Sequence, residues 1–325
     1  MEREEGELLI AEPLGMCAGV RRAIETVEQA LDTFNAPVYV RHEIVHNTHI
    51  IESLRNQGAI FVEDIAEVPT GAVLVLNAHG VSAQVREEAQ SGGRRVFDAT
   101  CPFVAKIHVE IAKLSREGFD FLLIGHAGHP EVEGTLGQLP GRIHLVTDVA
   151  DVLAVAVPDP NRLAVATQTT MSVDDARDIL AAIRHRFPQA REPRLSDICY
   201  ATTNRQEAVR QLAPEVDLVL VVGSATSSNA RRLYELAQRR SATAYLVDGP
   251  DDLEPAWFAG RPRVGLSAGA SVPDSIVQRV VDRVRALGIR SVSRVPGAVE
   301  TIVFPPVPGL RRVSSLASFT QGNQL

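Results

Sequence analysis

The chain has 325 residues, of which 45% are hydrophobic and 22% are charged, as in soluble globular proteins of two or three domains. Its formal net charge of −7 offers no general attraction to nucleic acid. Residues 1–7 are too acidic for a secretory signal, and no apolar run approaches the ~20 residues that a membrane span needs. We therefore expect a cytoplasmic protein that acts on a small molecule and binds neither nucleic acid nor a membrane.

Short aliphatic and β-branched runs alternate with amphipathic helical stretches along the chain. This alternation predicts an α/β fold with small, mostly parallel sheets. Ligands of such sheets bind beyond the carboxyl ends of the strands, so the segments that follow the runs are candidates for a site. The predicted strands cover residues 38–40, 73–76, 121–124, 163–165, 219–222 and 263–266.

The three cysteines, Cys17, Cys101 and Cys199, each precede a predicted helix. Apolar residues recur with helical spacing after the first, and a proline suited to a first helical position follows the second. After the third, Thr203 and Gln206 have the spacing of a capping box. Each thiol is thus expected near a helix N-terminus, where the helix dipole favours the thiolate that binds metal.

Three thiolates without a fourth cysteine can hold a cubane iron–sulfur cluster with one open iron, or a three-iron cluster. A zinc site of three sulfurs and one histidine is an alternative, although its ligands usually lie closer in sequence. Three cysteines buried for structural reasons are another alternative. The odd count and the absence of a CxxC motif argue against a disulfide framework. An open iron would indicate redox or Lewis-acid chemistry on a substrate oxygen.

An internal repeat of about 98 residues divides the chain. His129 follows Cys101 at the same 28-residue distance at which Ser227 follows Cys199, and residues 169–175 resemble residues 269–274. Because each unit offers one cysteine, we expect the units to meet at a common centre. The predicted division is an N-terminal strand segment at 1–16, α/β units at 17–97, 98–196 and 197–285, and a C-terminal segment at 286–325 that is flexible beyond about residue 305.

Polar side chains that can donate hydrogen bonds cluster at the predicted strand ends and helix starts. Such a set suits a diphosphate held by many short donors and helix N-termini, because the chain lacks a P-loop. Singly, each serine or threonine could be a plain helix cap and each histidine a buried core group. Glu131 could stabilise a helix N-terminus or relay protons beside a metal. The donors are His46, His79, His129, Thr169, Ser227, Ser228, Asn229 and Ser271.

Eight strings, in order between about residues 8 and 305, carry a family resemblance. They lie at residues 15–20, 39–47, 78–82, 97–102, 125–131, 168–170, 198–206 and 227–229. Together they closely resemble the 4-hydroxy-3-methylbut-2-enyl diphosphate reductases, also called the LytB/IspH family, which complete the methylerythritol phosphate route to isoprenoids.

The resemblance implies a trefoil of three pseudo-repeated α/β units around one [4Fe-4S] cluster per chain, held by Cys17, Cys101 and Cys199. It implies reductive dehydroxylation of the allylic diphosphate to isopentenyl and dimethylallyl diphosphate, with reduced ferredoxin or flavodoxin as the electron donor. Glu131, Thr169 and His129 would be catalytic, with Glu131 supplying protons and Thr169 contacting the substrate hydroxyl. Substrate would be bound by His46, His79, His129, Thr169, Ser227, Ser228, Asn229 and Ser271.

An iron–sulfur redox sensor, or an inactive paralogue with the same fold, is the main alternative. An iron–sulfur hydro-lyase is a second alternative, and it would need no electron donor.

Overall fold

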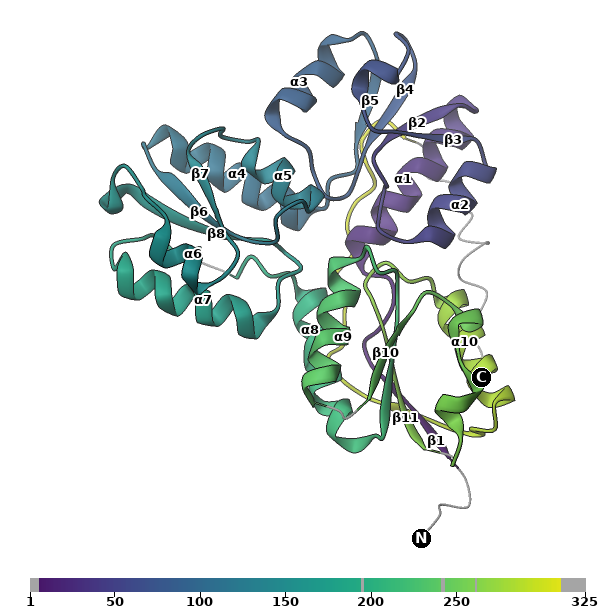
Figure 1. The fold of residues 1–325 in the computed structure, drawn as a ribbon. Helices are drawn as coiled ribbons and strands as arrows, with labels where there is room; N and C mark the ends of the chain where they lie inside the picture. The colour runs from purple at the N-terminus through teal and green to yellow at the C-terminus, as the bar shows by residue number, and fades with distance from the viewer. Residues whose placement is uncertain (1–5, 194–195, 241–242, 261, 311–325) are drawn as a thin grey trace.

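Three lobes surround a common centre in the computed structural model, which describes residues 6–193, 196–240, 243–260 and 262–310 (Figure 1). Each lobe contains one sheet, and the strands are paired in parallel in all three sheets. The predicted fold of three α/β units is therefore confirmed. The predicted flexible end lies, from residue 311 onward, outside the described residues.

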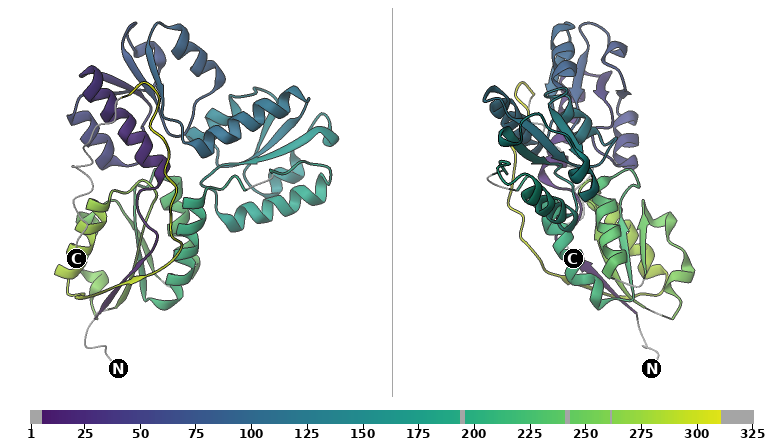
Figure 2. Two further views of the ribbon diagram at one scale, coloured as in Figure 1. Left: turned by 180° about the vertical axis from the view of Figure 1, so that it is seen from behind. Right: turned by 60° about the vertical axis from the view of Figure 1, so that its left-hand side comes forward.

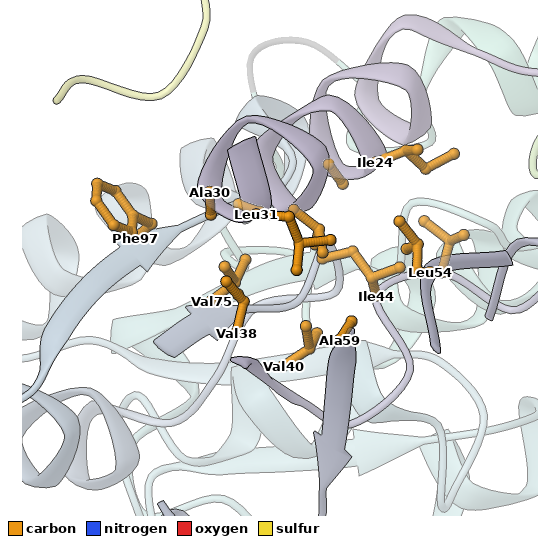
Figure 3. Close-up of a cluster of buried hydrophobic side chains, with 14 of the residues drawn as sticks. Ile24, Ala30, Leu31, Val38, Val40, Ile44, Leu54, Ala59, Val75 and Phe97 are labelled. Atoms are coloured by element: carbon orange, nitrogen blue, oxygen red, sulfur yellow. The ribbon is translucent and has the colours of Figure 1, made fainter. Parts of the chain in front are cut away.

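The first lobe holds a four-stranded sheet in the order β3-β2-β4-β5. Its strands are β2 (Val38–Arg41), β3 (Ala59–Val62), β4 (Val73–Leu76) and β5 (Arg95–Asp98). Its helices are α1 (Ala18–Phe34), α2 (Thr48–Asn56) and α3 (Ala83–Ser91). In the core, the apolar face of α1, including Ile24 and Leu31, packs against Val38 and Val40 of the central strand (Figure 3). Burial of this face explains the helical spacing of apolar residues after Cys17.

The second lobe holds a three-stranded sheet in the order β7-β6-β8. Its strands are β6 (Asp120–Ile124), β7 (Ile143–Val146) and β8 (Leu163–Thr167), and its helices are α4 (Pro102–Arg116), α5 (Pro130–Leu136), α6 (Val149–Ala154) and α7 (Val173–Arg186).

The third lobe holds a five-stranded sheet in the order β10-β9-β11-β1-β12. Its strands are β1 (Glu7–Ala11), β9 (Leu218–Val222), β10 (Ala244–Val247), β11 (Arg263–Ala268) and β12 (Ser291–Val295), and its helices are α8 (Tyr200–Leu212), α9 (Ser228–Arg240) and α10 (Asp274–Ala286). Since β1 and β12 come from outside residues 197–285, this sheet is larger than the repeat predicted.

The same order of elements recurs in all three lobes. A cysteine precedes a helix, and the helix leads to an inner strand of the sheet (β2, β6 or β9), which a polar loop follows. A second strand pairs on one side of this inner strand and a third on the other, and the third again ends in a polar loop. Because all strands of a sheet are parallel, both polar loops lie at its carboxyl edge. The six strands predicted from the sequence are confirmed.

Each cysteine is the N-cap residue of its helix, as predicted. The predicted capping box is wrong, because Thr203 lies inside α8 and Gln206 binds a different segment. The side chain of Gln206 accepts a hydrogen bond from Val173 N at 2.9 Å and donates one to Met171 O at 2.9 Å. Gln206 therefore joins the second and third lobes.

Within the described ranges, every helix is too short or too polar to span a lipid bilayer.

Residues 296–310, here called the C-terminal strap, leave β12 and run past the centre of the molecule to the first lobe (Figure 2). The strap is fastened by the buried guanidinium of Arg205, which is 1% exposed and lies 2.8 Å from a carboxylate oxygen of Glu300. Two further nitrogens of Arg205 donate to Gly15 O at 2.7 and 3.1 Å. One buried cation thus holds both the strap and the loop that leads to Cys17. Farther along, Val307 is buried in the core of the first lobe.

We expect Glu300→Ala to lower the free energy of unfolding by about 3 kcal/mol, because it leaves the buried charge of Arg205 without its anion. Arg294→Ala is the matched control, since it breaks the exposed pair with Glu12 and should change stability by less than about 1 kcal/mol. Urea unfolding of both variants measures the difference. Equal effects would show that Arg205 does not depend on Glu300.

Candidate functional site

A single cavity at the junction of the three lobes is lined by all twelve side chains that the sequence indicated. Its volume is about 100 Å³, several times the roughly 10–15 Å³ that one water molecule requires. The twelve are Cys17, Cys101, Cys199, His46, His79, His129, Glu131, Thr169, Ser227, Ser228, Asn229 and Ser271. Residues about 250 positions apart therefore form one site.

The three thiols enter the cavity from the N-termini of α1, α4 and α8. Cys17 Sγ accepts a hydrogen bond from Val20 N at 3.5 Å, and Cys199 Sγ lies 3.3 Å from Thr202 Oγ1. A Cβ atom at Gly19 would lie 2.6 Å from Cys101 Sγ and 3.9 Å from Cys17 Sγ. The absence of a side chain at Gly19 therefore allows thiols from two lobes to approach each other.

Burial raises the pKa of the Cys101 thiol to about 12 and that of the Cys199 thiol to about 11, despite hydrogen bonds from helix N-terminal groups that act in the opposite direction. The helix dipole alone, which we expected to favour thiolates, is therefore weaker here than desolvation. A bound cation would reverse this balance, because coordination deprotonates a thiol.

The donor set fits an iron–sulfur cluster. Three sulfurs face one cavity, and its wall between them is apolar, formed by Val20, Ala78 and Val104. Three cysteines would leave one iron of a cubane cluster without a protein ligand. Among the described residues, no three or more His, Cys, Asp or Glu side chains are grouped around a position for a single metal ion. The thiols thus fit a multi-iron cluster better than the zinc site considered above.

Three histidine rings form a cluster on another part of the cavity wall. The ring centroids of His46 and His79 lie 4.3 Å apart and stack, whereas His129 meets them edge-on at 5.5 and 5.7 Å. His129 Nδ1 accepts a hydrogen bond from Glu131 N at 3.1 Å, which places the proton of the neutral ring on Nε2. His46 Nδ1 lies 2.9 Å from a carboxylate oxygen of Glu43.

Burial makes a positive charge unfavourable on the rings of His79 and His129. It lowers the pKa of His129 to about 3, and it lowers the pKa of His79 well below the ordinary value; the neighbouring histidines lower both further. His46 Nε2 and His79 Nδ1 are buried without a hydrogen-bond partner. Buried nitrogens normally form hydrogen bonds, and an anionic ligand would provide both the acceptors and a compensating charge.

Glu131 is buried and binds Thr169 through both carboxylate oxygens. Thr169 N donates to one oxygen at 2.6 Å and Thr169 Oγ1 donates to the other at 2.8 Å. Burial raises the pKa of Glu131 to about 7, although these hydrogen bonds act to lower it. Thr169 O in turn accepts a hydrogen bond from Cys199 N at 3.1 Å. A carboxyl group that can exchange a proton near neutral pH is thus fixed next to the thiols.

The remaining hydroxyl and amide groups lie at loops of the third lobe. Asn229 Oδ1 accepts from Ala270 N at 2.8 Å, so it joins the loops after β9 and β11. Ser228 Oγ accepts from Thr170 Oγ1 of the second lobe at 3.0 Å. Ser271 Oγ donates to His46 O of the first lobe at 2.9 Å. These groups therefore hold the lobes together around the cavity.

Several residues that support the site were not predicted from the sequence. Thr202 and Thr170 line the cavity, and their positions beside Cys199 and Thr169 were the available signals. No feature of the sequence indicated a role for Gln138. Its side chain donates to Val81 O and Gly134 O, both at 2.7 Å, and so fastens the loop after His79 to α5, the helix that begins next to His129. One helix thus fixes two histidines from different lobes.

The fold and the site define a class: α/β proteins in which three repeated units bring three thiols and a group of histidines and hydroxyls to one cavity. Within this class the chain belongs to the LytB protein family, whose model matches residues 8–285.

Curated relatives of high identity carry one name. The chain is 60% identical over 309 residues to the 4-hydroxy-3-methylbut-2-enyl diphosphate reductase of Methylibium petroleiphilum, and the match covers 95% of this chain and 94% of that protein. It is 58% identical over 305 residues to the enzyme of the same name from Polaromonas sp., covering 94% and 92%.

Solved structures agree with the fold. The E-1-hydroxy-2-methyl-but-2-enyl-4-diphosphate reductase from Plasmodium falciparum superposes with a TM-score of 0.90 at 38% identity, covering 94% of this chain and 96% of that chain. A second, described as an (E)-4-hydroxy-3-methyl-but-2-enyl diphosphate reductase and the terminal enzyme of the non-mevalonate pathway, gives a TM-score of 0.62 at 34% identity, covering 86% and 99%.

We expect Glu131 to make stability depend on pH. Its pKa in the folded protein, about 7, exceeds the ordinary value of 4.5, so the folded state binds more protons between these pH values. The free energy of unfolding therefore falls as pH rises through this window, by up to about 3 kcal/mol from this group. In urea unfolding of the cluster-free protein, the advantage of Glu131→Gln over wild type should grow from pH 4.5 to 7. The control Glu133→Gln, on the exposed side of α5, should show no such trend. Parallel curves for wild type and Glu131→Gln would contradict the assignment.

Proposed function

We propose that this protein is a 4-hydroxy-3-methylbut-2-enyl diphosphate reductase that catalyses the final step of the methylerythritol phosphate pathway. The observation that carries the proposal is a single cavity combining three thiols, a cluster of three histidines and a buried Glu131–Thr169 pair. The names of the high-identity relatives support it.

The overall reaction consumes two electrons and two protons for each substrate molecule. The allylic C–O bond breaks and the oxygen leaves as water. A new C–H bond forms at one or the other end of the allyl group, which gives isopentenyl or dimethylallyl diphosphate. The site must therefore bind a diphosphate, deliver protons to two positions and receive electrons.

Cys17, Cys101 and Cys199 would hold one [4Fe-4S] cluster. When bound, such a cluster supplies single electrons and Lewis acidity. The buried position of the thiols keeps bulk water away from the reacting carbon, and the apolar wall that includes Val20 and Val104 has the same effect.

His46, His79 and His129 would bind the diphosphate together with Ser227, Ser228, Asn229 and Ser271. A bound anion would raise the pKa of the His79 and His129 rings, which burial otherwise keeps neutral, so that these rings could take up protons and donate to it. Ser228 and Asn229 lie at the N-terminus of α9, where the positive end of the helix dipole favours an anion. Fixing the diphosphate positions the hydroxyl end of the substrate for reaction.

Glu131 would deliver the proton that the departing hydroxyl needs. When the carboxyl is protonated, its Oε2–H can donate to Thr169 Oγ1, whose own hydrogen then points toward the substrate oxygen. A pKa of about 7 lets Glu131 lose and regain this proton at neutral pH. Thr169 thereby both contacts the hydroxyl and transmits the proton.

Reduced ferredoxin or flavodoxin would supply the electrons one at a time. The reductase differs in this requirement from the alternatives considered from the sequence. Neither the redox sensor, the inactive paralogue nor the hydro-lyase converts the substrate by donor-dependent reduction.

The deciding experiment is anaerobic turnover of 4-hydroxy-3-methylbut-2-enyl diphosphate by protein reconstituted with iron and sulfide. We expect both five-carbon diphosphate products with a low-potential electron donor and neither without it. Product formation without a donor would indicate a hydro-lyase. Cluster-loaded protein that forms no product under either condition would indicate a sensor or an inactive paralogue.

We also expect binding of an alkyl diphosphate to take up protons. His79 and His129 are neutral in the ligand-free site, and an anion raises their pKa, so affinity should increase as pH falls from about 8 to 6. Calorimetry with isopentenyl diphosphate in buffers of different ionisation enthalpy measures the uptake. His129→Gln should reduce it, whereas His185→Gln, on the exposed face of α7, should not. Equal proton uptake in wild type and His129→Gln would exclude His129 as a proton acceptor.

A further inference from the structure

The C-terminal strap crosses the centre of the molecule on the face that Figure 2 shows from behind. Between Val299 and Phe304 its side chains differ in exposure in the manner of an extended segment, whose successive side chains point to opposite sides. One row of this segment is therefore turned toward the protein and the other toward solvent.

The inward row fixes the strap. Glu300 binds Arg205 and also accepts a hydrogen bond from Asn204 Nδ2 at 3.2 Å. The ring of Phe304 meets the ring of Phe103 edge-on, with centroids 6.0 Å apart. One residue farther on, Pro305 O accepts a hydrogen bond from Arg22 Nε at 2.9 Å. The backbone between these contacts is therefore held at both ends.

The outward row exposes apolar side chains that folding does not require. Val299 and Val303 of this row are each 87% exposed, and Ile302, which belongs to the inward row, is still 38% exposed. Single exposed apolar residues are common, but several on one fixed segment indicate a surface that another molecule covers.

A short series of aromatic rings connects the strap to residues that follow the cysteines in the sequence. Phe103 follows Cys101 by two residues, and its ring centroid is 5.6 Å from that of Tyr200, which follows Cys199. The hydroxyl of Tyr200 accepts a hydrogen bond from Ala18 N, directly after Cys17, at 3.1 Å. Phe304 therefore joins the exposed segment to rings that lie within two residues of Cys101 and Cys199 in sequence and are hydrogen-bonded to the residue after Cys17.

We propose that Val299 and Val303, together with the exposed part of Ile302, form the docking surface for the one-electron carrier protein that reduces this enzyme. The inference rests on the proposed function, which requires electrons from outside the chain. In each encounter the reduced carrier gives up one electron and leaves oxidised, so two encounters supply the two electrons of the reaction. A carrier on the strap brings its redox group close to the thiols without entering the substrate cavity.

The chemistry of the surface indicates how the carrier is held. The segment from Val299 to Phe304 carries one charged residue, Glu300, which is turned inward and paired. The net charge of −7 gives no long-range attraction to an acidic carrier. Contact through a few apolar side chains fits the small, short-lived interfaces of electron-transfer complexes. Binding should therefore depend little on salt.

The test uses cluster-loaded protein and ferredoxin as the probe, with the dissociation constant measured by anaerobic calorimetry at low and high salt. The double variant Val299→Asp with Val303→Asp should weaken binding about tenfold or more, since each valine would contribute its own buried area. The pair Val299→Ser with Val303→Ser should weaken it less. Leu153→Asp, at a site on α6 that is 62% exposed, is the control and should leave binding unchanged.

Turnover separates this proposal from the proposed function. With dithionite and methyl viologen as reductant, wild type and all variants should be equally active, whereas ferredoxin-supported turnover should fall in the strap variants. A dissociation constant unchanged by the aspartate pair would overturn the docking surface. Absence of turnover with the chemical reductant in wild type would instead overturn the proposed function, and the binding comparison would still test the surface.

Discussion

Desolvation at the junction of the three lobes is the constraint on which the site depends. It keeps the thiols of Cys101 and Cys199 protonated, holds the imidazoles of His79 and His129 neutral and brings the pKa of Glu131 to about 7. Two thiols and two imidazoles of the cavity are thus uncharged near neutral pH. A bound metal centre would compensate the charge of the thiolates that it forms, and protonation of the histidines would compensate that of a bound diphosphate.

Most of the architecture could be predicted from the sequence because the repeated unit leaves strong local patterns. The runs that became β4, β8 and β9 are buried along their whole length, and such strands are continuously apolar. The positions of the site residues followed from the same pattern, since the polar loops occupy equivalent strand ends in each unit. That all twelve share one cavity required no information beyond the repeat and the family resemblance.

The features that could not be predicted depend mainly on contacts between segments that are distant in the sequence. The flanking strand β5 is only partly buried and has a charged residue at each end, so its sequence lacks a continuous apolar run. Nothing near Gln138 indicates that it binds the loop after His79, because both acceptors are backbone carbonyls. The capping box at Thr203 failed for the same reason, since Gln206 finds its partners in another lobe.

The place of β1 in its sheet sets the order in which the protein can mature. This strand, the first of the chain, lies between β11 and β12, the last two, and the loop after it is bound by Arg205 together with Glu300. During synthesis β1 therefore has no strand to pair with until β11, at residues 263–268, has left the ribosome. Because Cys17 N also donates a hydrogen bond to Ala270 O in the loop after β11, the three thiols come together only when the third lobe has folded, and a metal centre held by all three would form late in folding.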